Sequence, residues 1–186
     1  MMINHLVKSF ENFKELSSQW NTFRDKGTKI MSTLVNKHLK VSYIDLYDFS
    51  DSIKENTSLQ FKYKQSQFND LISCYEKLNS TILELKAIVE KINENLSSLS
   101  VSKKPKSYQE TIELKLYEYY EDIIKMYNKS LENKQQIINN IMNTEDRDQL
   151  LILITCWSND IHINNKTIDL VEEIFKTENN NSPLYK

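Results

Sequence analysis

Apolar residues repeat most regularly between residues 68 and 99, where the steps alternate between three and four. This period places one narrow apolar stripe along a long helix, and another helix is what covers such a stripe. No polar residue interrupts the series, which we call the heptad seam. Its a positions are Phe68, Tyr75, Ile82, Val89 and Leu96, and its d positions are Leu71, Leu78, Leu85, Ile92 and Leu99. Such a seam is more typical of a protein that binds other proteins than of an enzyme.

The positions that flank the seam are mostly neutral. A homodimeric zipper places complementary charges at the e and g positions. Here those positions hold Ile72, Cys74, Asn79, Thr81, Lys86, Ile88, Asn93 and Asn95. We therefore expect more than one helix to neighbour this segment, and we expect the chain itself to supply them.

A first long helix is predicted from about residue 4 to 39. Its stripe holds Leu6, Phe13, Leu16, Trp20, Phe23, Ile30 and Leu34 in the same heptad register. Gly27 falls on that stripe, although glycine inside a helix costs about 1 kcal/mol relative to alanine. Glycine there either kinks the helix or permits the close approach of a partner backbone. The unbroken apolar spacing favours close approach.

A third long helix opens at the capping box of Ser107 and Glu110 and runs to about residue 143. Its stripe holds Tyr117, Tyr120, Ile124, Tyr127, Leu131, Lys134, Ile138 and Ile141. The tyrosines are typical of a bundle core whose hydroxyl groups reach water. Lys134 makes this stripe more amphiphilic than the heptad seam.

Two short helices are predicted from about 145 to 158 and from about 166 to 177. Thr144 is the expected N-cap of the first, with acidic residues in its first turn. This helix contains LLILITCW, which is apolar on nearly all sides, so we expect several neighbours to bury it. The short helices would close one end of a bundle or dock a partner.

The pattern as a whole predicts an all-α fold. We expect an elongated antiparallel bundle of three long coiled-coil-like helices with two short C-terminal helices. Residues 1–178 would form a single domain with linkers at about 40–55 and 97–107, and residues 179–186 a disordered tail. The alternative is an open arrangement that only another chain completes.

Composition narrows the classes of fold and function. One glycine and two prolines in 186 residues disfavour an all-β fold, and they leave no glycine-rich phosphate loop. A net charge of -2 argues against direct nucleic-acid binding, and no stretch is long enough to span a membrane. Lys103, Lys104 and Lys106 are a candidate nuclear-import signal, although a solvated linker is the favoured interpretation.

Residue types that carry chemistry are sparse. His5, His38 and His162 have no acidic residue three positions before them, and Cys74 and Cys156 form no CxxC pair. We therefore predict no enzyme activity, no cofactor and no metal, with both cysteines as buried free thiols. The acidic cluster of Glu118, Glu121 and Asp122 is a solvated face or pairs with a basic partner, and the solvated face is favoured.

Trp20 and Trp157 are candidate anchors for a partner protein, because a few buried aromatic residues carry most of the energy of protein interfaces. The other interpretation is that both are ordinary core residues. LLILITCW favours the core interpretation for Trp157.

The order of these features resembles one known family. The run from Trp20 through Thr22 and Phe23 to Gly27, with Ile30 and Asn36 after it, is similar to the N-terminal helix of the cyclin-dependent kinase 2-interacting protein family. FNDLISCYEKLNSTILELKAIVEKI is similar to the family's central coiled coil. YEYYEDIIKMYNKSLENKQQIINNI, followed by LLILITCWSNDIHIN, is similar to its C-terminal part. The resemblance covers about residues 8 to 165. It departs after Trp157, where the family tends to carry proline and this chain has Ser158, Asn159 and Asp160.

The resemblance implies a nuclear adaptor without enzymatic activity, also present in the cytoplasm. Its partners by resemblance are AAA-type ATPase subunits, a second small helical subunit and cell-cycle kinases. The processes implied are DNA replication, genome maintenance and ribosome biogenesis. The alternative from the periodicity is a structural coiled-coil subunit, such as a kinetochore component, a tether or a spectrin-like spacer.

Overall fold

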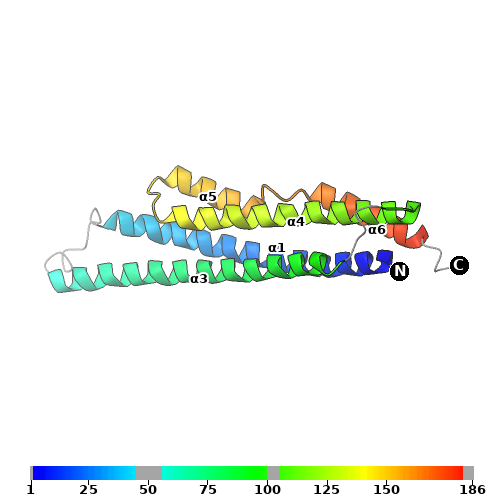
Figure 1. Cartoon of the computed structure of the whole chain (residues 1–186). Coiled ribbons are helices and arrows are strands. Elements are labelled where there is room, and N and C mark those ends of the chain that lie inside the picture. Colours follow the sequence, from blue (N-terminus) through cyan, green and yellow to red (C-terminus); the bar gives the residue numbers. More distant parts are fainter. Residues whose placement is uncertain (1, 45–55, 100–104, 182–186) are drawn as a thin grey trace. The chain divides into compact units, whose positions relative to one another are not determined.

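The computed structural model describes residues 2–44, 56–99 and 105–181, and these residues contain helices and no strand. The long helices are α1 (Met2–Ser42), α3 (Thr57–Ser97) and α4 (Tyr108–Ile141). The short helices are α5 (Arg147–Asn159) and α6 (Asn165–Asn181). The all-α prediction, with three long helices followed by two short ones, is confirmed (Figure 1).

These helices are grouped into two compact units, and neither unit is a continuous stretch of chain. Unit 1 comprises residues up to Thr22, Leu85–Glu132 and residues from Asp160 onward, so its short helix is α6. Unit 2 comprises Phe23–Glu84 and Asn133–Asn159, so its short helix is α5. Each unit therefore combines segments of α1, α3 and α4 with one short helix. The single domain over residues 1–178 stays a prediction.

Helix directions in unit 2 follow from two contacts between α1 and α3. The Cys74 thiol donates to the Ile30 carbonyl at 3.6 Å, and Lys37 Nζ lies 3.3 Å from Asp70 Oδ2. Later residues of α1 thus meet earlier residues of α3. The two helices are antiparallel, as Figure 1 shows for this unit.

In unit 1, α1 and α4 run in the same direction. The Tyr120 hydroxyl donates to the Ser9 carbonyl at 3.3 Å, and the hydroxyl groups of Ser17 and Tyr127 are 2.7 Å apart. Residue numbers rise together along both helices, so α1 and α4 are parallel. Both tyrosine hydroxyls bond α1 rather than reaching water, which differs from the expectation for this stripe.

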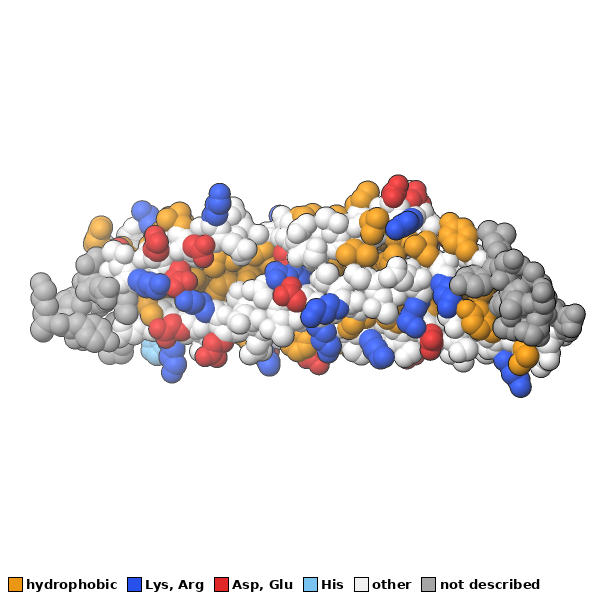
Figure 2. Space-filling view, turned by 180° about the vertical axis from the view of Figure 1, so that it is seen from behind, with side chains coloured by type: hydrophobic (Ala, Val, Ile, Leu, Met, Phe, Trp, Pro, Cys, Tyr) orange, Lys and Arg blue, Asp and Glu red, His pale blue; other side chains and the backbone are white. Residues whose placement is uncertain are grey.

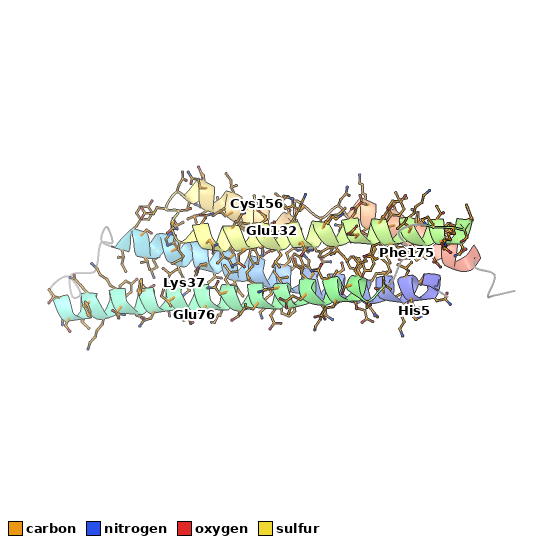
Figure 3. The ribbon with its side chains drawn as sticks, in the orientation of Figure 1. His5, Lys37, Glu76, Glu132, Cys156 and Phe175 are labelled. Atoms are coloured by element: carbon orange, nitrogen blue, oxygen red, sulfur yellow. The ribbon has the colours of Figure 1, made fainter. Side chains whose placement is uncertain are left out.

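The short helix α6 fills the fourth position of unit 1. The Phe10 and Phe175 rings stack with centroids 4.6 Å apart, and Lys14 Nζ lies 2.7 Å from Glu172 Oε1. Phe175 of α6 is labelled in Figure 3. These pairs make α6 antiparallel to α1. The aromatic core around them consists of Phe10, Phe13, Trp20, Tyr120, Tyr127 and Phe175.

Most of the heptad seam is buried by this chain itself. The buried members are Leu71, Leu78, Ile82, Leu85, Val89, Ile92 and Leu96. Tyr75 and Leu99 are half-buried, and Leu99 lies beyond the end of α3. Phe68 differs from the prediction, because 49% of it is exposed.

The ends of α4 and α5 show which capping predictions hold. At α4, the Ser107 hydroxyl accepts from Glu110 N at 3.2 Å, and Glu110 Oε2 accepts from Lys106 N at 2.7 Å. The Ser107 half of the predicted capping box is thus present, whereas the Glu110 carboxylate bonds the N–H of Lys106, one residue before the N-cap, instead of that of Ser107. At α5 the predicted cap at Thr144 is wrong, because the Asp146 carboxylate accepts the Asp148 N–H at 2.8 Å.

Candidate interaction surfaces

Gly27 on α1 of unit 2 makes room for Trp157 on α5. A Cβ atom at residue 27 would lie 2.4 Å from Cζ2 of the Trp157 ring, closer than side-chain atoms approach one another. The ring also bonds the α1 backbone, because Trp157 Nε1 donates to the Arg24 carbonyl at 3.0 Å. The close approach predicted at Gly27 is present, and it accommodates an indole ring rather than a backbone.

Lys134 of α4 is fully buried against the same tryptophan in unit 2. Its ammonium donates to the Trp157 carbonyl and lies 4.9 Å from the centre of the Trp157 ring. A cation at the last turn of a helix interacts favourably with the helix dipole. Lys134 therefore bonds the C-terminal turn of α5 to α4, which accounts for a lysine in the apolar stripe.

Trp20 has a separate polar partner in unit 1. Its Nε1 donates to Asp160 Oδ2 at 2.9 Å, and the Ser130 hydroxyl donates to Asp160 Oδ1 at 2.6 Å. Asp160 is buried and has φ of 44°, in the left-handed region that aspartate tolerates better than most residues. This role of Asp160 was not predicted from the sequence, where the residue stood out only as a departure from the family pattern. Its position directly after a helix was the signal available for a left-handed residue.

The two tryptophans are interior residues rather than surface anchors. Both indole rings are fully buried, and both N–H groups are bonded within their own unit. Neither ring is therefore presented to a partner in this structure. Of the nuclear-import candidates, Lys103 and Lys104 lie outside the described residues, and Lys106 is exposed.

Two clefts in the described residues are lined by side chains that could take part in chemistry, among them a histidine in one and a cysteine in the other. In unit 1 a cleft of about 390 Å³ between α1 and α3 is lined by His5, Lys8 and Asn95, among others. In unit 2 a cleft of about 270 Å³ contains Cys74 and Lys37. Burial raises the pKa of the Cys74 thiol, and the nearby charges of Lys37 and Lys77 offset only part of this increase. The thiol form therefore dominates at neutral pH.

Metal-binding and membrane-spanning elements were also sought among the described residues. No group of histidine, cysteine and acidic side chains there is arranged to hold a metal ion. Among those same residues, no helix has the length and apolar character to cross a bilayer. Cys156 is partly exposed on α5, unlike the buried free thiol expected there.

The outer face of α5 in unit 2 presents apolar side chains to solvent. Leu150 and Trp157 are buried, whereas Leu151 is 47% and Ile152 is 59% exposed. The expectation that several neighbours bury LLILITCW is therefore wrong. As the fourth helix of its unit, α5 packs through one face and leaves the other uncovered.

A second exposed apolar set lies on α3 in the same unit. Phe61 is 67% exposed, Phe68 is 49% exposed, and Leu83 is also exposed. Figure 2 shows hydrophobic side chains at the surface near the end of unit 2 where α3 begins. Phe61 and Phe68, which are one heptad apart, share one face of α3 and are candidates for protein contacts.

Comparison with known proteins leaves the family open. No family model matches this chain, and no curated protein matches it significantly.

Proposed function

We propose that this protein is a non-enzymatic adaptor that binds protein partners through the outer faces of its helices. The supporting observation is the uncovered apolar face of α5, where Leu151 and Ile152 are exposed beside the buried Leu150 and Trp157. An amphipathic or apolar helix face of this kind suits helix-to-groove or helix-to-helix recognition. Most of the heptad seam and both tryptophans are buried by contacts within the chain. Partner binding is therefore proposed for the outer faces of the helices.

The resemblance to the cyclin-dependent kinase 2-interacting protein family makes the proposal more specific. By that resemblance the partners are AAA-type ATPase subunits, a second small helical subunit and cell-cycle kinases. The setting is the nucleus, with a cytoplasmic pool, in DNA replication, genome maintenance and ribosome biogenesis. These partners and this setting rest on the motifs around Trp20, the heptad seam and Trp157 alone.

Affinity purification of the tagged chain from its native cell, followed by mass spectrometry, tests the adaptor role. We expect stoichiometric AAA-type ATPase subunits with the wild type. A variant with Leu151→Ser and Ile152→Ser should recover at least tenfold less of them while its melting temperature stays near that of the wild type. Leu170→Ser on the exposed side of α6 is the matched control. A wild-type chain that recovers no such subunit would contradict the resemblance-based partners.

The second candidate is a structural coiled-coil subunit that pairs with itself. It requires a seam that another copy can cover, and Phe68 at the edge of the heptad seam is the exposed residue that favours it. Light scattering across a range of concentrations separates the two functions. The adaptor predicts a constant molar mass, whereas a self-pairing scaffold predicts a mass that rises with concentration.

A further inference from the structure

Few buried side chains hold α6 to unit 1. Among the side chains of α6 that the structure describes, only Val171 and Phe175 are buried, and the others are half-buried or exposed. Phe175 stacks on Phe10 of α1, and the Glu172 carboxylate accepts a hydrogen bond from Lys14 of α1 at 2.7 Å. The docking of α6 therefore relies on two apolar side chains four residues apart and on one carboxylate next to the first.

The contact between α6 and α1 is also incompletely packed. A cleft of about 130 Å³ lies between the two helices, with Phe10 and Lys14 of α1 and Phe175 of α6 among the residues in its walls. Close-packed protein interiors leave few gaps larger than a water molecule, because each gap forfeits dispersion contacts. This contact therefore lacks part of the stabilisation that a closely packed helix pair has.

The chain is fixed in place just before α6. Asp160 is buried, and its carboxylate accepts hydrogen bonds from Trp20 and from Ser130. Residues 161–164, which join Asp160 to α6, are exposed or half-buried. Backbone rotation in residues 161–164 would therefore move α6 away from α1 while Asp160 keeps both of these bonds.

Beneath α6, the aromatic side chains of unit 1 are held by contacts of their own. Phe10 lies 5.4 Å from Phe13 and 5.8 Å from Tyr120, measured between ring centroids. The Tyr120 hydroxyl donates to the Ser9 carbonyl, which joins α4 to α1 without α6. Detachment of α6 would therefore leave a preformed apolar groove beside Phe10, and it would release the Lys14 ammonium, whose ion-pair partner belongs to α6.

We propose that α6 is a reversibly docked helix, which occupies within its own chain a helix-binding groove on unit 1. It detaches by rotation in residues 161–164 while α1, α3 and α4 of unit 1 stay folded. The open groove accepts in its place a helix of the same chemistry, with two apolar side chains for the surface at Phe10 and a carboxylate for Lys14. The groove belongs to unit 1 and the outer face of α5 to unit 2, so this site is independent of the proposed adaptor surface.

Hydrogen exchange of the full-length chain, followed by mass spectrometry, measures the detachment of α6. A detached helix of 17 residues is marginal in water, so its amides exchange once it leaves α1. Amides of residues 169–178 should exchange roughly 100-fold faster than those of residues 10–20 and 116–127, because local opening costs less free energy than global unfolding. Equal exchange rates in all three segments would mean that α6 leaves only when unit 1 unfolds, which overturns the proposal.

The carboxylates of α6 supply a matched pair of variants. Glu172→Gln removes the ion pairs with Lys14 and Lys176, so the exchange of α6 at pH 7 should rise roughly threefold while that of α1 and α4 stays unchanged. Glu173→Gln changes the charge of α6 by the same amount and should leave the exchange of α6 as it is. A rise of the same size in both variants, or throughout unit 1, would contradict reversible docking through Glu172.

A fluorescein-labelled peptide of residues 161–178 tests the groove, with binding to the full-length chain measured by fluorescence anisotropy. In the wild type the chain's own α6 competes at an effective concentration that is roughly millimolar, so the peptide should bind weakly. Phe175→Ala in the full-length chain weakens this competitor and opens the groove, so the peptide should bind roughly tenfold more tightly. Leu170→Ala, at an exposed position of α6, is the matched control and should leave the affinity at the wild-type level.

Variants of α1 locate the site of peptide binding. Phe10→Ala, added to the Phe175→Ala chain, should return the peptide affinity to the wild-type level or below. Lys14→Glu, at an exposed position, should also weaken peptide binding to the Phe175→Ala chain, and it keeps the test decisive if circular dichroism melts show that Phe10→Ala unfolds unit 1.

Other outcomes of the peptide experiment overturn the proposal. Equal peptide affinity of the wild type and the Phe175→Ala chain, or an affinity that neither variant of α1 changes, removes the groove. A dimer in light scattering that Phe175→Ala abolishes would mean that α6 docks on a second copy rather than within its own chain.

Discussion

A single glycine decides how α5 packs on α1 in unit 2. The apolar spacing of α1 was sufficient to predict close approach at Gly27. The identity of the approaching group was not predictable, because Trp157 is far away in the chain and its ring conformation is set by packing. The indole of Trp157 occupies the volume that any larger side chain at residue 27 would need.

Gly27→Ala is therefore expected to destabilise the protein. Alanine improves helix propensity by about 1 kcal/mol, but a methyl group 2.4 Å from the ring forces overpacking that costs about 1–3 kcal/mol. Urea unfolding of wild type and variant measures the difference. In a Trp157→Leu background the penalty should shrink, because the ring is gone. An increase in stability on Gly27→Ala in the wild-type background would contradict the packing described.

At the scale of the element, the sequence predicted the positions of the helices better than it predicted their caps and their burial. The Ser107 cap of α4 was predictable because a serine hydroxyl caps the N–H three residues later, which is a local contact. The cap of α5 was not, because Thr144 and Asp146 are both good capping residues and only the observed backbone selects Asp146. Burial of α5 was overestimated, because an apolar sequence does not reveal how many helices surround it.

The docking of α6 in unit 1 should depend on acid pH through Glu172. Hydrogen bonds from Lys14 and then Lys176 lower the pKa of this carboxyl below its usual value of 4.5. A lowered pKa in the folded state stabilises the fold above pH 4.5, and that stabilisation is lost as the pH falls through the folded-state pKa. Glu172→Gln should thus lower the melting temperature at pH 7 and have little effect near pH 3.

Thermal melts followed by circular dichroism at both pH values measure this dependence. Glu173→Gln is the matched control, because it neutralises the adjacent carboxylate on α6, whereas the ion pairs with Lys14 and Lys176 are made by Glu172. A Glu172→Gln effect of the same size at pH 3 and pH 7 would mean that the carboxylate charge is not what holds α6 to α1.

At the scale of the whole molecule, the class of fold and the alternating helix directions were predictable from heptad periodicity and loop placement. The division into two units was not, because the apolar stripes of α1, α3 and α4 run through both units without a change in pattern. The exposure of Phe68 and Phe61 was missed for a related reason. Periodicity shows which face of a helix is apolar, but it does not show where the covering helix ends.

The continuity of α1, α3 and α4 through both units predicts that the units unfold together. The chain has two tryptophans, Trp20 in unit 1 and Trp157 in unit 2, so each unit has its own fluorescent reporter. Trp157→Phe leaves the reporter of unit 1, and Trp20→Phe leaves that of unit 2. In each variant the fluorescence and circular dichroism transitions in urea should coincide. Separate transitions within one variant would indicate independent units.

The interleaved composition of the two units determines how binding regions in this protein are to be mapped. Ending the chain after Glu132 would remove α5 from unit 2 and α6 from unit 1 in one step. Removal of the first 22 residues would take α1 from unit 1, and with it Phe10, Phe13 and Trp20 of the aromatic core. In deletion mapping, a truncated chain would thus lose its partner because it no longer folds. Point substitutions at exposed positions avoid this and can assign a binding site.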